Sequence, residues 1–148
     1  MGAMTYNKSP ISMKEGKIFI DGQEVVDSVE CKITFTPQTA SARFLGNSGK
    51  STRWLGYDIK AVVVRGRTNA FLKDMISKYK RTRITPEYTI QGIMDDPGSD
   101  YVADGNGPIV VTAVGCVPTG DIDLIHSNTD SNDFLKDTIN FEVFDVEF

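Results

Sequence analysis

The sequence predicts a mainly β fold of the α+β class, an antiparallel β-sandwich or partly closed barrel with one flanking helix. Most apolar residues alternate with polar ones in short runs that are separated by turn-forming clusters. Only one segment has apolar residues at helical spacing. At 148 residues, the chain is long enough for one domain to bury most of its apolar surface without covalent staples.

The first strands are expected between residues 16 and 36. Asp21-Gly22 separates two apolar-containing runs, and this dipeptide is typical of a tight hairpin turn because both central positions need a positive φ. A clean alternation then indicates a half-buried strand whose apolar face holds Val29, Cys31, Ile33 and Phe35. The wet face of that strand is predicted to hold Glu30, Lys32, Thr34 and Thr36.

Residues 37–56 are expected to form a long, polar, glycine-dotted loop. Connections without secondary structure that exceed roughly 12 to 15 residues are uncommon in compact domains, and they are usually functional or disordered. Aromatic and arginine side chains, which dominate the energetics of many protein interfaces, occur in this stretch. We therefore predict that it contacts neighbouring subunits through Arg43, Phe44, Leu45, Gly46, Asn47, Gly49, Lys50, Arg53, Trp54 and Gly56.

A strand and a helix are predicted after this loop. The strand covers residues 57–65, and both of its faces carry apolar residues, so we expect it to be covered on both sides. Thr68 is placed to cap a helix that runs to about residue 80. The helix is predicted from one apolar stripe, which consists of Phe71, Leu72, Met75, Ile76 and Tyr79.

The remaining residues are predicted to be strands and turns. Strands are expected at 87–94, 109–117 and 121–126, and a loop is expected at 95–108. In the last segment, 138–148, the apolar residues change phase between Val143 and Phe144. Such a change indicates a bulge or a bend that passes the strand from one layer to the next.

The charges are divided unequally along the chain. Residues 1–86 hold 15 Lys and Arg against 7 Asp and Glu, whereas residues 87–148 hold one basic residue, Lys136, against 13 acidic ones. Alternating apolar residues in the acidic half must be packed, so this half is not a solvated tail. The asymmetry favours head-to-tail association of identical subunits. The two cysteines, Cys31 and Cys116, are expected to be small buried residues of a reduced protein.

Several catalytic and ligand-binding motifs are only partly present. Residues 46–52 resemble the end of a phosphate-binding loop, but Phe44 occupies the position of the first glycine, and a strand is expected to follow. His126 is the only histidine and has no accompanying nucleophile signature. The acidic turn at 95–104 lacks the spacing of a calcium loop. The sequence therefore predicts no enzyme activity, no cofactor, no metal site and no membrane span.

Short phrases along the chain resemble the tail tube proteins of contractile phages and phage-tail-like bacteriocins of Firmicutes, of the PBSX-like and diffocin type. These phrases are EGKIFIDGQEV, the glycine-rich stretch between LG and GY, FLKDMISKYK, YTIQGIMDDP and FEVFDVEF. The resemblance covers the chain from about residue 15. It implies a single tail-tube domain at 16–148. Residues 1–15 lack periodicity and are expected to form a loosely held arm. Because Met1-Gly2-Ala3 precede Met4, we interpret these three as residues left from cloning.

The resemblance also implies a function. Proteins of this kind form hexameric rings that stack into a hollow inner tube within a contractile sheath, without an enzymatic step. The partners would be other copies of the chain together with the sheath and baseplate proteins. The subunits would be made and assembled in the bacterial cytoplasm. The lumen would either let DNA pass, without binding it specifically, or serve as a membrane-breaching channel. We expect the lumen wall to be acidic or neutral and to include Glu30, Lys32, Thr34 and Thr36.

Two alternatives stay open from the sequence. Residues 43–83 hold 11 Lys and Arg against Asp58 and Asp74, interleaved with aromatic residues, so a nucleic-acid-binding or nucleotide-binding module is one of them. A tube subunit of a type VI secretion system would have the same architecture.

Overall fold

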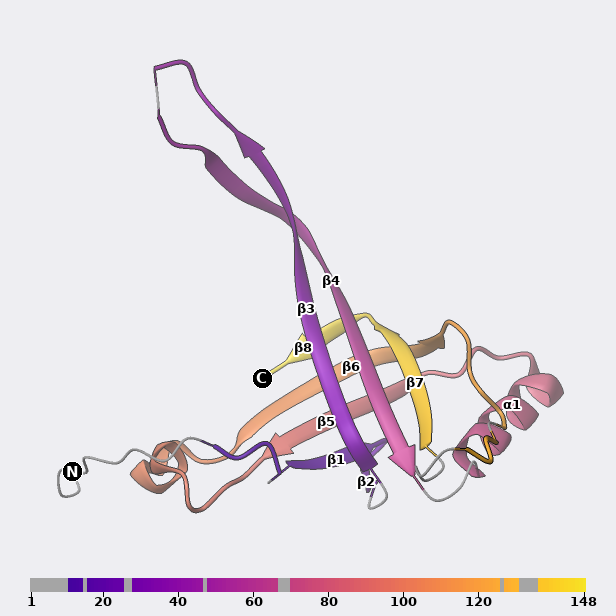
Figure 1. Cartoon of the computed structure of the whole chain (residues 1–148). Helices are drawn as coiled ribbons and strands as arrows, with labels where there is room; N and C mark the ends of the chain where they lie inside the picture. Colours follow the sequence, from indigo (N-terminus) through magenta and orange to yellow (C-terminus); the bar gives the residue numbers. More distant parts are fainter. Residues whose placement is uncertain are drawn as a thin grey trace.

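The computed structural model describes residues 11–14, 16–25, 28–46, 48–66, 70–125, 127–130 and 136–148, apart from the side chain of Ala103. Within this part of the chain there are eight antiparallel strands: seven follow the order β2-β1-β5-β6-β7-β4-β3, and β8 pairs with β6 beside this path (Figure 1). The strands are β1 (Gly16–Ile20), β2 (Gln23–Glu24), β3 (Ser28–Ala42), β4 (Ser51–Gly66), β5 (Tyr88–Met94), β6 (Ile109–Thr119), β7 (Lys136–Val143) and β8 (Asp145–Glu147). The helices are α1 (Ala70–Thr82) and a short π-helix, η1 (Val102–Asn106). The predicted mainly antiparallel β fold with one α-helix is confirmed.

The strands face each other in two layers that share β6. The first part of β6 pairs with β5 and β8, and its last residues, 117–119, pair with β7. Side chains from both layers meet in one core, because alternate residues of each strand point inward. This core consists of Ile20, Ala61, Val63, Leu72, Met75, Ile90, Ala113, Cys116, Ile139 and Phe141.

Helix α1 closes one end of the core. Leu72 and Met75 of its apolar stripe are buried, whereas Tyr79 near the helix end is exposed. An aromatic chain links the helix to the sheet: the ring centroids of Phe71 and Tyr88 lie 5.3 Å apart, and those of Tyr88 and Phe141 lie 6.2 Å apart. The helix begins at Ala70 and ends at Thr82, so its predicted position is confirmed within two residues. Thr68, its predicted cap, lies outside the described residues.

The turn at Asp21-Gly22 has the predicted conformation. Asp21 has a φ of 52° and Gly22 a φ of 83°, as a tight hairpin turn with two left-handed central residues requires. The turn is also fixed to β5, because the Asp21 amide donates to the Thr89 carbonyl at 2.9 Å. In return, the Thr89 amide donates to Asp21 Oδ1 at 2.9 Å. The smallest hairpin of the fold is therefore tied to its neighbouring strand.

The predicted change of phase near the C-terminus is a break between β7 and β8. Phe144 lies between the two strands, and its amide donates to the Val114 carbonyl of β6 at 3.1 Å. At this point β6 itself bulges, because Val114 and Gly115 both lie opposite Thr89 of β5. The chain thus leaves one layer and enters the other where β6 does the same.

The predicted loop at 37–56 is wrong in its secondary structure. β3 continues to Ala42 and β4 begins at Ser51, so only residues 43–50 connect them. The two strands pair along this length, which satisfies backbone groups that a polar loop would leave to water. Pro37 is tolerated within β3 because this strand lies at the edge of the sheet and a proline has no N–H group to donate.

Two other predictions differ from the structure. A strand was expected at 121–126, but none of residues 121–125 lies in a strand. Ile122 packs against the core there, and His126 lies outside the described residues. The expected loop at 95–108 contains η1. Of the predicted N-terminal arm, the structure describes residues 11–14, where the Ser12 amide donates to Asp96 Oδ2 at 3.0 Å.

Gly115 is predicted to be essential for the crossing of β6 by the last strands. Its φ is 67°, and a Cβ atom there would lie 2.6 Å from Cβ of Phe144. We expect Gly115→Ala to lower the free energy of unfolding by about 1 to 3 kcal/mol from backbone strain, with a further loss from displacement of Phe144. Urea unfolding followed by circular dichroism measures this change.

Gly92→Ala is the matched control for this prediction. Gly92 lies in β5 without a left-handed φ, and an added Cβ would meet no atom within 4 Å. We expect this variant to be as stable as the unchanged protein or slightly more stable. Equal losses in the two variants would contradict the proposed role of Gly115.

Candidate assembly surface

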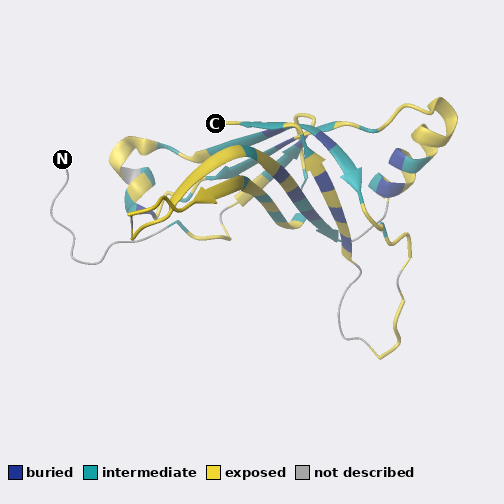
Figure 2. Ribbon diagram, turned by 90° about the horizontal axis from the view of Figure 1, so that it is seen from above, coloured by how far each residue is buried: buried dark blue, intermediate teal, exposed yellow. Residues whose placement is uncertain are grey.

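A long hairpin arm projects from the body of the molecule. β4 has 16 residues, but β7 pairs only with its residues from Ile59 to Gly66. Beyond Ile59, β4 is paired with β3 alone, and the two strands extend well past the other strands (Figure 1). We call residues 36–57 the arm. Its side chains are largely exposed, as the yellow outer part of the hairpin in Figure 2 shows.

The structure gathers the sequence-predicted interface residues on this arm. Arg43, Phe44, Leu45, Gly46, Gly49 and Lys50 lie at its tip, and Arg53, Trp54 and Gly56 lie in the outer half of β4. All of them are exposed except Gly56, which is half-buried. Asn47 lies outside the described residues. The tip and the outer strands thus present apolar and basic side chains to solvent far from the core.

Three aromatic rings form a row where the arm meets the body; we call Phe35, Trp54 and Tyr57 the ring row. The Phe35 ring stacks on the Tyr57 ring with 5.0 Å between centroids, and it lies 5.8 Å from the Trp54 ring. Exposed fractions are 42% for Phe35, 63% for Trp54 and 48% for Tyr57. Phe35 pairs with Ile59, which is buried, so the ring row continues the core-facing side of the sheet beyond the body. The sequence indicated burial for Phe35 and Tyr57 and did not predict the contact of Phe35 with Trp54.

The register of the arm changes once. Gln38 lies opposite Gly56 and Thr39 lies opposite Trp54, so β4 has one more residue than β3 at this point. The Gln38 side chain crosses to β4, where its Nε2 donates to Asp58 Oδ2 at 3.0 Å. No sequence pattern indicated this irregularity, because it depends on which residues pair.

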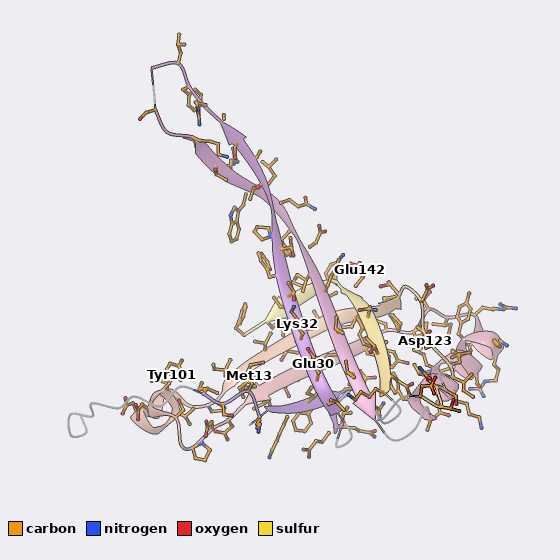
Figure 3. All side chains as sticks on the ribbon, in the orientation of Figure 1. Met13, Glu30, Lys32, Tyr101, Asp123 and Glu142 are labelled. Carbon is orange, nitrogen blue, oxygen red and sulfur yellow. The ribbon has the colours of Figure 1, made fainter. Side chains whose placement is uncertain are left out.

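The predicted lumen residues lie on the opposite face of the same sheet. Glu30, Lys32, Thr34 and Thr36 are all exposed, and their partners on β4 are Val64, Val62, Lys60 and Asp58. Figure 3 places Glu30 and Lys32 on β3 and Glu142 on β7, with β4 between these strands. Lys60 lies 4.0 Å from Glu142 in an exposed ion pair, which contributes little to stability. This face is solvent-exposed and carries charges of both signs.

A groove opens between the two layers on the side away from α1. Its volume is about 870 Å³, and its floor includes Gly92, Met94 and Val111 of β5 and β6. Cys31 and Ile33 of β3 line the facing wall. The groove is mainly apolar, with Lys14, Lys17, Glu24 and Glu30 also in its lining.

The basic stretch at 43–83 does not form one surface. Its first part lies at the arm tip, and its last part lies at the end of α1, on a separate part of the molecule (Figure 1). The exposed cations of α1 and its exit are Lys73, Lys78, Lys80, Arg81 and Arg83. This division weakens the alternative of a continuous nucleic-acid footprint, which needs clustered cations.

The geometry of the other sequence motifs does not build a catalytic or ligand-binding centre in the described part of the chain. Ser51 begins β4, so a strand and not a helix follows the lysine of the phosphate-loop-like phrase. Among the described residues, no group of three or more His, Cys, Asp or Glu side chains has a metal-binding arrangement. None of the helices in the described ranges is both long and apolar enough to span a membrane.

Comparisons with solved structures identify the fold. A chain from the sheath–tube complex of the extracellular contractile injection system PVC in its extended state has a TM-score of 0.68 and 12% identity, and the match covers 93% of this chain and 90% of that one. A chain from the sheath/tube terminator of the same system has a TM-score of 0.68 and 13% identity, and the match covers 95% of this chain and 96% of that one. A chain from the baseplate of the anti-feeding prophage has a TM-score of 0.62 and 14% identity, and the match covers 99% of this chain and 96% of that one.

The chain has the fold of these injection-system proteins. At 12 to 14% identity, the similarity concerns the fold. No protein-family model matches the chain, and no curated protein matches its sequence.

Both thiols are predicted to stay protonated in the folded protein. Burial raises the pKa of Cys31 and of Cys116 from 9.0 to about 11, and the carboxylate of Glu30 adds to the shift at Cys31. Between pH 9 and 11 the unfolded chain loses these protons while the folded chain keeps them. We therefore expect the free energy of unfolding to fall as the pH rises through this window, with the full contribution present below pH 9.

Urea unfolding at several pH values measures this decrease. The Cys31→Ala/Cys116→Ala variant is the control, and we expect its stability to change less between pH 9 and 11. Equal pH dependence in the two proteins would contradict the assignment.

Proposed function

We propose that this protein is a structural subunit of the inner tube of a contractile phage tail or phage-tail-like particle. Its subunits form hexameric rings that stack into a hollow tube within a sheath. The observation that carries the proposal is the projecting arm, whose apolar and basic side chains are largely exposed in the described part of the chain. The fold similarity to chains of contractile injection systems supports the same role.

The arm is the element that joins subunits in this proposal. It exposes Phe44, Leu45 and Trp54, and exposed apolar side chains that cluster with arginines are typical of protein interfaces. None of the described residues of the arm belongs to the core or packs against it, so the arm adds little to the stability of the subunit's core. Partners are therefore other copies of the chain within and between rings, with the sheath and baseplate proteins outside them.

The polar face of β3, β4 and β7 is the proposed lumen wall. Its exposed charges are Glu30, Lys32, Asp58, Lys60, Lys136 and Glu142, so it carries both signs in equal number. Such a wall lets DNA or another anionic cargo pass without holding it, because tight binding of a nucleic acid needs a concentration of positive charge. The subunit's role is then to line a conduit and not to catalyse a reaction.

Removal of the arm's contacts is expected to stop assembly without unfolding the subunit. We predict that Trp54→Ala, or deletion of residues 41–52, gives a folded monomer, because none of these residues belongs to the core. Negative-stain electron microscopy and sedimentation velocity measure assembly, and circular dichroism measures folding. Ile125→Ala is the control, since Ile125 is exposed but lies outside the arm. Normal tubes from both arm variants would refute the assignment.

The lumen assignment predicts a difference in chemical access. A cysteine at Thr34, on the polar face, is expected to react with a small maleimide in assembled tubes but hardly at all with a large polymer-coupled maleimide. Lys80→Cys, on exposed α1, is the matched control and should react with both reagents in tubes without a sheath. Mass spectrometry measures the labelling. Equal access of the large reagent to both positions would overturn the lumen assignment.

A further inference from the structure

The extra residue in β4 determines which side chain joins the ring row. Leu55 and Gly56 both lie opposite Gln38, and the next pair is Thr39 with Trp54. Side chains of a strand alternate between faces, and paired residues share a face. Thr39 is in phase with Phe35 and Pro37, so Trp54 lies on their face. The 5.8 Å distance between the Phe35 and Trp54 rings agrees with this placement.

A regular hairpin would give a different surface. If Leu55 paired with Thr39, then Leu55 would lie beside Phe35, and Trp54 would pair with Ala40 on the polar face. The row of three rings exists only because Leu55 has no partner of its own on β3, so that Trp54 lies on the same face of the hairpin as Phe35 and Tyr57. A one-residue change of register exchanges the faces of all following residues.

Local contacts stabilise this irregularity. The Gln38 side chain bonds to Asp58 on the polar face, and it passes over Gly56, where a Cβ atom would lie 3.1 Å from Gln38 Oε1. Beyond the irregularity the ladder continues to the pair of Ala42 with Ser51, and the Ser41 and Thr52 hydroxyls lie 3.1 Å apart. Beyond the bulge, β3 and β4 therefore remain paired, in a register shifted by one residue relative to the inner part of the hairpin.

We propose that the Leu55 bulge is a positioning device that places Trp54 in the ring row, and that the row docks on a second copy of this chain. This inference rests on the proposed function of the arm, and it specifies which face of the arm makes the contact and what places Trp54 on that face. Leu55, Gln38 and Gly56 are positioning residues, and Trp54 makes the contact.

The charges of the arm argue for a second copy as the partner. Residues 36–57 hold three cations, Arg43, Lys50 and Arg53, and no acidic residue. Residues 87–148 of any copy hold 13 acidic residues against Lys136. A basic arm is complementary to a surface rich in carboxylates, and residues 87–148 of a second copy supply carboxylates in excess.

Two changes of backbone length test the bulge. Deletion of Leu55 removes the bulge but keeps Trp54 opposite Thr39, on the face of Phe35. Insertion of one alanine between Gln38 and Thr39 also removes the bulge, since the new residue pairs with Leu55, and it turns Trp54 to the polar face. Both variants thus regularise the hairpin, and only the insertion displaces the tryptophan.

We expect the deletion to assemble like the unchanged protein and the insertion to need a roughly tenfold or higher concentration for assembly. In the inserted chain, the exchange Leu55→Trp with Trp54→Leu returns a tryptophan to the ring row, and it should restore assembly. Trp54 is the only tryptophan, so a blue shift of its emission on assembly reports its burial directly.

The outcomes separate the two levels of the proposal. Normal assembly of Trp54→Ala and of the arm deletion would overturn the role of the arm. Suppose instead that Trp54→Ala and the arm deletion do not assemble. If the Leu55 deletion and the alanine insertion then assemble equally, or if the Leu55/Trp54 exchange does not restore assembly of the inserted chain, only the role of the bulge is overturned. An unchanged protein that stays monomeric at millimolar concentration would overturn the second copy as partner.

Discussion

The structure depends on the mismatch in length between β4 and the strand beside it. β7 covers eight residues of β4, from Ile59 to Gly66, and the remaining residues of β4 have only β3 as a neighbour. Within the covered part, Ile59, Ala61 and Val63 are buried and join the core. Beyond it, the same face carries Tyr57, Trp54 and Phe35, whose side chains stay 42 to 63% exposed. One sheet therefore supplies both the core and the exposed ring row, and the boundary between them is the end of β7.

This continuity explains why a well-folded subunit keeps so much exposed apolar surface. The energetic cost of the exposed row is limited because Phe35 stacks on Tyr57 and lies near Trp54, and such aromatic pairs contribute about 0.5 to 1.5 kcal/mol beyond their burial. Tyr57 is also held to the last strand, because its hydroxyl donates to Asp145 Oδ1 at 3.4 Å. The base of the arm is thus fixed before any partner is bound, and a preordered surface loses less entropy on docking.

Local signals in the sequence predicted the local features well. Asp21-Gly22, the apolar stripe of α1 and the change of phase at Phe144 each depend on neighbouring residues, and each was found where it was expected. The outer arm was missed because both of its faces are exposed, so residues 38–42 and 51–56 lack the apolar alternation that reveals a half-buried strand. The phase of Trp54 could not be predicted at all, because it depends on pairing across the hairpin. At residues 121–125 a strand was predicted and none is found. Alternation of apolar and polar residues is not sufficient for a strand, because a strand also needs a neighbouring strand to pair with.

The open edge of β3 places a further constraint on assembly. β3 lies at the end of the sheet, and a long edge strand with unpaired backbone groups invites uncontrolled pairing with other chains. Pro37 interrupts the donors of this edge near its middle, and the charged Glu30 and Lys32 occupy its inner half. An edge divided in this way disfavours continuous pairing along its whole length. Specific association must then rely on side chains, and those available here are the three rings of the row and the three cations of the arm.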